Sequence, residues 1–168
     1  MNGQHIGMMT AAELYPLVVR GLAESGLGDV AANDARKDWL LGLIDLLKVR
    51  SRTIDDIVHQ AAPYLRDAVE YDADAVAKQW KDKVATRDIL AAIRDALADV
   101  DPWTLATTEA SLRTLAESRG LGAGKLFQPL RVALTGSAAS PGIFDVLVVL
   151  GREKSLARIE RAIDVLQS

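Results

Sequence analysis

The chain has 168 residues, of which 49% are hydrophobic; it carries a formal net charge of −3 and has no cysteine. This size allows one domain or two small ones with a real core, and the lack of cysteine excludes a disulfide framework and thiolate metal sites. No apolar run approaches the roughly 20 residues of a membrane span. We therefore expect a soluble, cytoplasmic monomer with no membrane partner.

Apolar residues recur at spacings of three and four along most of the chain, which predicts amphipathic helices whose apolar stripes form a core. The run from Val146 to Leu150 is also compatible with a buried strand, but its neighbours keep the helical spacing, so we interpret it as helix. In chain order the stripes are Leu14 to Leu22, Leu40 to Leu47, Ile54 to Leu65, Ile89 to Val100, Leu112 to Ala116, Ile143 to Leu150 and Leu156 to Leu166.

Turn residues mark where these helices should begin and end. Residues 26–28 (Gly-Leu-Gly) predict the end of the first long helix. Asp101-Pro102 predicts a break, after which Thr104 is suited to cap the next helix. The best internal boundary is therefore near residue 100, and we expect two helical subdomains, residues 1–100 and 101–168. The glycine-rich segment 120–124 precedes a helix rather than following a strand, so we expect a flexible connector and not a dinucleotide loop.

Four further residues give helix signals in the last third of the chain. Ser140 followed by Pro141 predicts a helix start, with a capping hydroxyl and a proline at the first helical position. Gly151 predicts the end of that helix. Pro129 is expected in the first turn of the helix before it, where proline is tolerated.

The sequence gives little support for catalytic or metal-binding chemistry. His5 and His59 are the only histidines, they lie far apart in the sequence, and no third ligand accompanies either one. No serine or threonine stands in a nucleophile motif. We therefore expect no metal site and no catalytic residue in this chain.

Arginines are the candidates for ligand binding, because a guanidinium can grip a base edge or a phosphate at two points. Arg50 follows an apolar helix, where it also fits a simpler role as a cation at the negative end of the helix dipole. Arg131 stands among apolar residues and needs a ligand or an acidic partner, such as Asp145 or Glu153. The segment 140–142 would present free N–H groups at a helix start, which suits phosphate or base oxygens.

Several segments resemble the anticodon-reading, C-terminal end of bacterial glutamyl-tRNA synthetases. The segments QPLRVALTG (residues 128–136) and SPGIF (140–144) match that family's pattern nearly verbatim. Residues 50–54 and 103–104 also fit, and the strip at residues 2–6 resembles the family's link to its catalytic body. The resemblance runs nearly end to end, although residues 67–98 fit mainly by order and spacing.

The resemblance implies an all-α cage of two helical subdomains that holds the anticodon loop of tRNA(Glu) and reads unstacked bases. The parent enzyme would join glutamate to tRNA with ATP and magnesium. Class I synthetases carry two catalytic signatures, His-Ile-Gly-His and Lys-Met-Ser-Lys-Ser. Residues 5–8 (His-Ile-Gly-Met) lack the final histidine of the first signature, and the second signature has no counterpart in the chain. We therefore expect a fragment that holds no cofactor, is inactive alone, partners with the catalytic domain of the parent synthetase and does not bind DNA.

The same resemblance assigns roles to seven residues. It implies that Arg50 contacts the third anticodon base and that two arginines lie near the first base, while a short segment packs against the first two. The two arginines are Arg113 and Arg131, and the segment supplies Ser140, Pro141, Ile143 and Phe144. The alternative is a helical protein–protein interaction module that kept the fold and lost tRNA binding. The acidic net charge slightly favours this alternative, because nucleic-acid-binding domains are usually basic.

Overall fold

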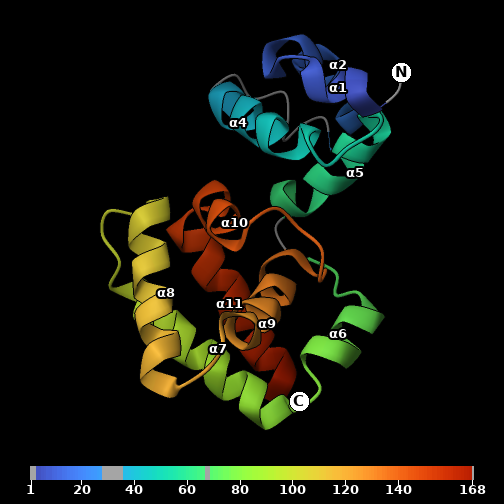
Figure 1. Ribbon diagram of the computed structural model, residues 1–168. Helices are drawn as coiled ribbons and strands as arrows, with labels where there is room; N and C mark the ends of the chain where they lie inside the picture. The colour runs from blue at the N-terminus through green and yellow to red at the C-terminus, as the bar shows by residue number, and fades with distance from the viewer. Residues whose placement is uncertain (1–2, 28–35, 67–68, 168) are drawn as a thin grey trace. The chain divides into compact units, whose positions relative to one another are not determined.

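The computed structural model describes residues 3–27, 36–66 and 69–167 (Figure 1). These ranges contain ten α-helices and no strand, so the predicted all-α fold is confirmed. The chain divides into two compact units, residues 1–67 (unit one) and 68–168 (unit two). None of the helices in the described ranges is long and apolar enough to cross a membrane.

Unit one owes its core to the predicted apolar stripes. On α2, the side chains of Leu14, Val18 and Leu22 are fully buried, and α2 packs against both α4 and α5. Lys48 at the end of α4 donates a hydrogen bond to the carbonyl of Met9, at 3.0 Å. The described helices of this unit are α1 (Gly3–Met8), α2 (Ala11–Glu24), α4 (Lys37–Lys48) and α5 (Ile54–Leu65).

Two helices of unit one begin with reciprocal capping boxes, which satisfy backbone donors that a helix start leaves open. At α2, Thr10 Oγ1 accepts from the Glu13 amide at 3.1 Å while the Glu13 carboxylate accepts from the Thr10 amide at 3.0 Å. Thr53 and Asp56 form the same arrangement at α5, with distances of 3.0 and 3.1 Å. These short local bonds fix where both helices start.

Unit two is organised around its last helix. Helix α11 packs most extensively against α7 and also contacts α9 and α10, while α8 packs against α7 and α10. The described helices are α6 (Ala73–Gln79), α7 (Lys83–Ala98), α8 (Leu105–Arg119), α9 (Ala123–Thr135), α10 (Ile143–Leu150) and α11 (Arg152–Gln167).

The boundary between the units differs from the one expected near residue 100. The break at Asp101-Pro102 is only a turn within unit two, because α7 before it packs against α11 after it. Thr104 does begin the next helix as predicted, since its Oγ1 accepts from the Thr107 amide at 3.2 Å. The residue types at the turn were therefore informative, but they did not mark the division into units.

The glycine-rich segment between α8 and α9 is a tight turn and not a loose connector. Gly120 ends α8 in the left-handed conformation, with a φ of 64°. The amide of Leu121 then donates to the carbonyl of Ala116 at 2.9 Å, and α9 starts two residues later at Ala123. The turn thus joins α8 closely to α9, and the two helices contact each other.

The prediction for Pro129 is wrong, because this residue lies in the middle of α9 (Ala123–Thr135) and not in its first turn. A proline there cannot donate a helical hydrogen bond and normally kinks or weakens the helix. The Pro129 carbonyl accepts a bond from Trp80 Nε1 at 3.2 Å, and the Trp80 side chain is buried. This contact ties α6 to α9 at the proline.

A short strap, residues 69–72, is fastened to the rest of unit two. Arg161 Nη1 donates to the carbonyl of Val69 at 2.6 Å, and its guanidinium lies 5.2 Å from the centre of the Tyr71 ring. The strap passes so close to Gly136, which has a φ of 78°, that a Cβ there would overlap the carbonyl oxygen of Glu70. Glycine is therefore required at position 136 both for its backbone conformation and for space.

Candidate nucleic-acid interface

A guanidinium in unit two lies against two aromatic rings from two other helices. Arg113 on α8 has its Cζ 5.9 Å from the ring centre of Phe127 on α9 and 5.8 Å from that of Phe144 on α10. The two rings meet edge to face, with centres 5.3 Å apart and planes at 82°. The Arg113 side chain is 55% exposed and also pairs with Glu109, one turn earlier, at 3.3 Å. We call Arg113, Phe127 and Phe144 the arginine–phenylalanine cluster.

The structure thus brings together Arg113 and Phe144, two of the residues singled out by the resemblance. It adds Phe127, which the sequence reasoning missed. The available signal was the position of Phe127 one helical turn before Arg131, because residues four apart on a helix share a face. Arg131 is half-buried, and its carbonyl accepts from Thr135 Oγ1 at 2.8 Å.

The prediction that Ser140 caps the next helix is wrong. Helix α10 begins at Ile143, and Gly142 occupies the N-cap position without a side-chain hydrogen bond. The Ser140 hydroxyl instead donates to the carbonyl of Pro141 at 2.8 Å, and Pro141 lies before the helix. No side chain therefore caps this helix start, although the carboxylate of Asp145 lies beside Gly142.

The four predicted residues of segment 140–144 differ in what they expose. Ile143 is only 3% exposed and Pro141 is also buried, so these two support the segment from inside. Ser140 and Phe144 are half-buried and reach the surface. The apolar surface near α10 is therefore formed by Phe144 with Phe127, and Ile143 contributes little to it.

Arg50 lies in unit one, in the turn between α4 and α5. The backbone of this turn is held firmly: the Arg50 amide donates to Leu47 O at 3.0 Å, and Ser51 Oγ donates to the same carbonyl at 2.9 Å. Gln60 Nε2 in turn donates to Ser51 Oγ at 2.9 Å. Arg50 itself is exposed, and its guanidinium makes no hydrogen bond or ion pair with any residue that the structure describes. Its side chain is available to a ligand while its backbone is fixed.

The other side of this turn is fixed by Asp56. Its Oδ2 accepts from the amides of Arg52 and Thr53, at 2.9 and 3.1 Å. The Arg52 amide is the main cause of a lowered pKa of the Asp56 carboxyl. The end of α4 is served by Lys48, which pairs with Asp45 at 2.9 Å. Lys48 is therefore a second cation at this helix end, beside Arg50.

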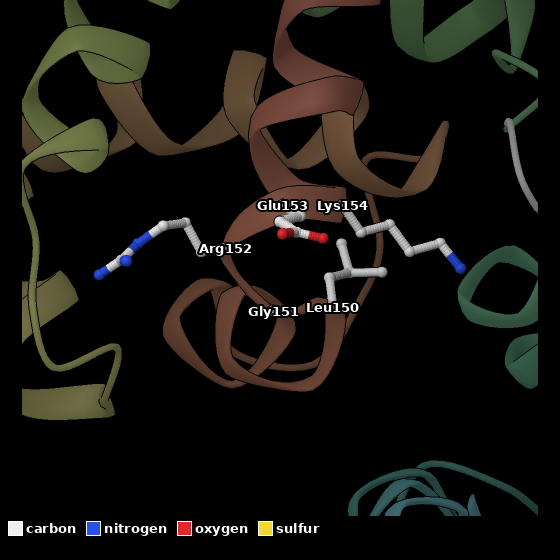
Figure 2. Close-up of a pocket in the computed structure, with 5 residues that line it drawn as sticks. All are labelled: Leu150, Gly151, Arg152, Glu153 and Lys154. Atoms are coloured by element: carbon white, nitrogen blue, oxygen red, sulfur yellow. The ribbon is translucent and has the colours of Figure 1, made fainter.

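A second feature of unit two is an open pocket where α10 gives way to α11 (Figure 2). Its lining runs from Leu150 to Lys154, and Figure 2 shows the side chains of Arg152 and Lys154 directed to opposite sides. The Arg152 guanidinium lies 5.7 Å from the ring centre of Trp103, whose Nε1 donates to Leu147 O at 2.8 Å. These contacts tie the start of α8 to the end of α10.

The described residues contain no group of three or more acidic, histidine or cysteine side chains arranged to hold a metal ion. His59 is exposed on α5. Of the strip at residues 2–6 quoted for the resemblance, residues 3–6 lie in α1, whereas residue 2 and the side chain of His5 lie outside what the structure describes.

Comparison with known families decides the affiliation. The model of the family described as the anticodon binding domain matches residues 10–163. The chain belongs to this anticodon binding domain family. The resemblance drawn from residues 128–136 and 140–144 is thereby confirmed, together with the helical anticodon-binding fold.

The relatives of this anticodon binding domain include glutamate–tRNA ligases. That of Roseiflexus castenholzii is 38% identical over 167 residues, which are 99% of this chain and 33% of the relative. That of Rhodopseudomonas palustris strain TIE-1 is 47% identical over 165 residues, 95% of this chain and 34% of the relative. The chain therefore spans about a third of the length of these relatives.

Solved structures agree with this affiliation. The crystal structure of a glutamate tRNA ligase from Elizabethkingia meningosepticum, in complex with its amino acid, superposes with a TM-score of 0.84 at 27% identity. The match covers 98% of this chain and 31% of that one. The glutamate–tRNA synthetase of Elizabethkingia anophelis gives a TM-score of 0.77, also at 27% identity.

Proposed function

We propose that this anticodon binding domain recognises the anticodon loop of tRNA(Glu) as the C-terminal part of a glutamate–tRNA ligase. The observation that carries the proposal is the arginine–phenylalanine cluster, with Arg113 5.8 Å from the ring centre of Phe144. Single-stranded RNA is commonly read by aromatic rings that stack on splayed bases and by guanidinium groups that bond to their edges. The cluster offers both on one partly exposed surface.

In this proposal the first two anticodon bases bind in unit two. Arg113 and Arg131 face the first base, and Phe144 supplies the apolar surface on which a base rests. Base–aromatic stacking is worth about 1–3 kcal/mol per base. Ser140 and Pro141 shape the wall of the pocket before α10, whose first N–H groups donate to base or phosphate oxygens.

The third base is assigned to Arg50 in unit one. In tRNA(Glu) this base is a cytosine, whose pairing edge offers the O2 and N3 acceptors to the guanidinium. Guanine, as in tRNA(Gln), presents donors at the corresponding positions and so meets the arginine unfavourably. The fixed backbone around Ser51 and Gln60 supports this role because it aims the arginine without using its donors.

The rest of the reaction would belong to the parent enzyme. The catalytic domain of that enzyme would join glutamate to tRNA with ATP and magnesium, in the cytoplasm, while this chain holds no cofactor and is monomeric. The motivation is that the ligases matched here are about three times as long as this chain.

A second candidate function is a protein–protein interaction module that kept the fold and lost tRNA binding. The observation in its favour is the net charge of −3. RNA binding releases counterions, so its affinity falls as the salt concentration rises. An acidic module that does not bind RNA would show no such salt dependence.

The test is a titration of the 168-residue chain with tRNA(Glu) at several salt concentrations, in which binding is measured by fluorescence anisotropy. We expect saturable binding whose logarithmic affinity falls linearly with the logarithm of salt concentration, and a preference for tRNA(Glu) over tRNA(Gln). An absence of binding at low salt would contradict the proposal and favour the protein–protein module.

A further inference from the structure

Phe127 contacts both of its partners in the arginine–phenylalanine cluster, yet neither the resemblance nor the sequence pattern gave it a role. Its ring lies edge to face with Phe144 at 5.3 Å and 5.9 Å from the Arg113 Cζ. We propose that Phe127 is a positioning residue: its ring fixes the Arg113 guanidinium and the Phe144 ring in the arrangement that receives an anticodon base. The inference rests on the proposed function and deepens it.

Arg113 needs such a support because its own helix holds it weakly. Its acidic partner, Glu109, is four residues earlier on the same helix, and both side chains are about half exposed, at 46% for Glu109 and 55% for Arg113. Exposed pairs of this kind add little, since solvent screens them and both long side chains lose freedom. The two rings come from other helices, so they fix the guanidinium relative to α9 and α10 as well.

Phe144 depends on Phe127 in the same way. An edge-to-face aromatic pair has a preferred geometry, because the positive edge of one ring meets the negative face of the other. Replacing Phe127 by leucine keeps an apolar side chain but removes both this pairing and one of the two faces that attract the cation. The ring of Phe144 and the Arg113 guanidinium then sample more orientations before RNA arrives, and ordering them costs affinity.

The first experiment measures binding of an anticodon stem–loop RNA carrying the glutamate anticodon. Phe127→Leu should raise the Kd about two- to tenfold. Phe127→Tyr, which keeps the ring, should bind nearly as well as the unaltered chain. Arg113→Gln and the double variant Phe127→Leu/Arg113→Gln complete a double-mutant cycle. Since part of the effect of Phe127 is proposed to pass through Arg113, the loss of affinity in the double variant should be smaller than the sum of the two single losses.

The second experiment needs no RNA and records the Arg113 Nε–Hε signal of the free chain by nuclear magnetic resonance. The ring current of two nearby phenylalanines should displace this signal, and Phe127→Leu should move it toward the value of a solvated arginine, whereas Phe127→Tyr should not. This measurement reports the position of the guanidinium even in a variant whose melting temperature has changed.

The outcomes separate the inference from the proposed function. Equal RNA affinity of Phe127→Leu and the unaltered chain, or fully additive effects in the cycle, would overturn the inference while leaving anticodon binding intact. If the unaltered chain fails to bind RNA, the proposed function falls, and with it the role of the cluster in receiving a base. An unmoved Arg113 signal in Phe127→Leu would independently refute the positioning itself.

Discussion

The amide of Asp72 donates a 2.8 Å hydrogen bond to the carbonyl of Gly136, and so joins the strap before α6 to the end of α9. The same glycine faces the Glu70 carbonyl closely enough that no side chain fits between them. Two segments far apart in the sequence therefore meet backbone to backbone, and the stability of unit two should depend on the absence of a side chain at position 136.

Gly136→Ala should destabilise the chain by about 2–4 kcal/mol, since it combines a strained left-handed backbone with overlap against Glu70. Gly120→Ala is a matched control, because Gly120 has a φ of 64° but nothing lies within 4 Å of the added Cβ. The control should lose only the conformational part, about 1 kcal/mol. Urea unfolding of both variants measures the difference, and equal losses would show that contact with the strap contributes nothing.

Arg50→Gln should reduce the preference for cytosine over guanine at the third anticodon position without abolishing RNA binding. A two-pronged contact of this kind gives about 1–3 kcal/mol of discrimination in duplex recognition. The measurement is the ratio of affinities for two stem–loop RNAs that differ only in that base. Arg52→Gln, two residues away and also exposed, removes the same charge and should keep the preference. An unchanged ratio in Arg50→Gln would show that Arg50 does not read the third base and contributes only a positive charge.

Arg131→Ala should weaken tRNA binding while leaving the melting temperature nearly unchanged, if the guanidinium serves the ligand. The alternative from the sequence, an internal ion pair with Asp145 or Glu153, predicts the reverse: lower stability and unchanged binding. Both quantities should be measured on the same preparation. Arg119→Ala, at the exposed end of α8, is a control for the loss of one positive charge.

Asp56 should make stability depend on pH in the acid range. Its carboxyl has a pKa below the ordinary 3.8, mainly because the Arg52 amide donates to it. A depressed folded-state pKa gives stability that is present above the unfolded value and is lost as the pH falls through the folded value. Asp56→Asn should therefore flatten the decline of melting temperature below about pH 4. Asp55→Asn removes a charge from the same helix start but neither amide bond, and a similar flattening there would contradict the assignment.

The chain alone should not activate glutamate, because neither class I signature occurs in its sequence. The check is ATP–pyrophosphate exchange in the presence of glutamate, with and without tRNA. Glutamate-dependent exchange above that of a buffer control would refute the assignment of catalysis to another part of the parent enzyme.

Local chemistry explains what the sequence predicted well. The stripes on α2 and the Thr104 cap depend on residues within one or two turns, so their pattern is legible in the sequence. The helix interpretation of Val146 to Leu150 was correct for the same reason, and Gly151 ends that helix as predicted, with a φ of 83°.

The errors involve contacts between distant segments or competition for one hydroxyl. Pro129 is accepted inside α9, where its carbonyl accepts a bond from Trp80, the residue that follows α6. Ser140 looked like a cap, but its hydroxyl donates to the Pro141 carbonyl instead. The unit boundary depends on the packing of α7 against α11, and the surroundings of Phe127 depend on Phe144 and Arg113, which come from two other helices. Apart from Pro141, none of these partners lies within a short window of sequence.

The positions of the tryptophans allow the two units to be distinguished by fluorescence. The three tryptophans divide between the units: Trp39 belongs to unit one, whereas Trp80 and Trp103 belong to unit two. Trp80 is only 3% exposed and should emit at short wavelength while its bond to Pro129 holds. A Trp39→Phe variant would then fluoresce from unit two alone. Comparing its unfolding curve with that of the unaltered chain would show whether the halves melt together or in turn.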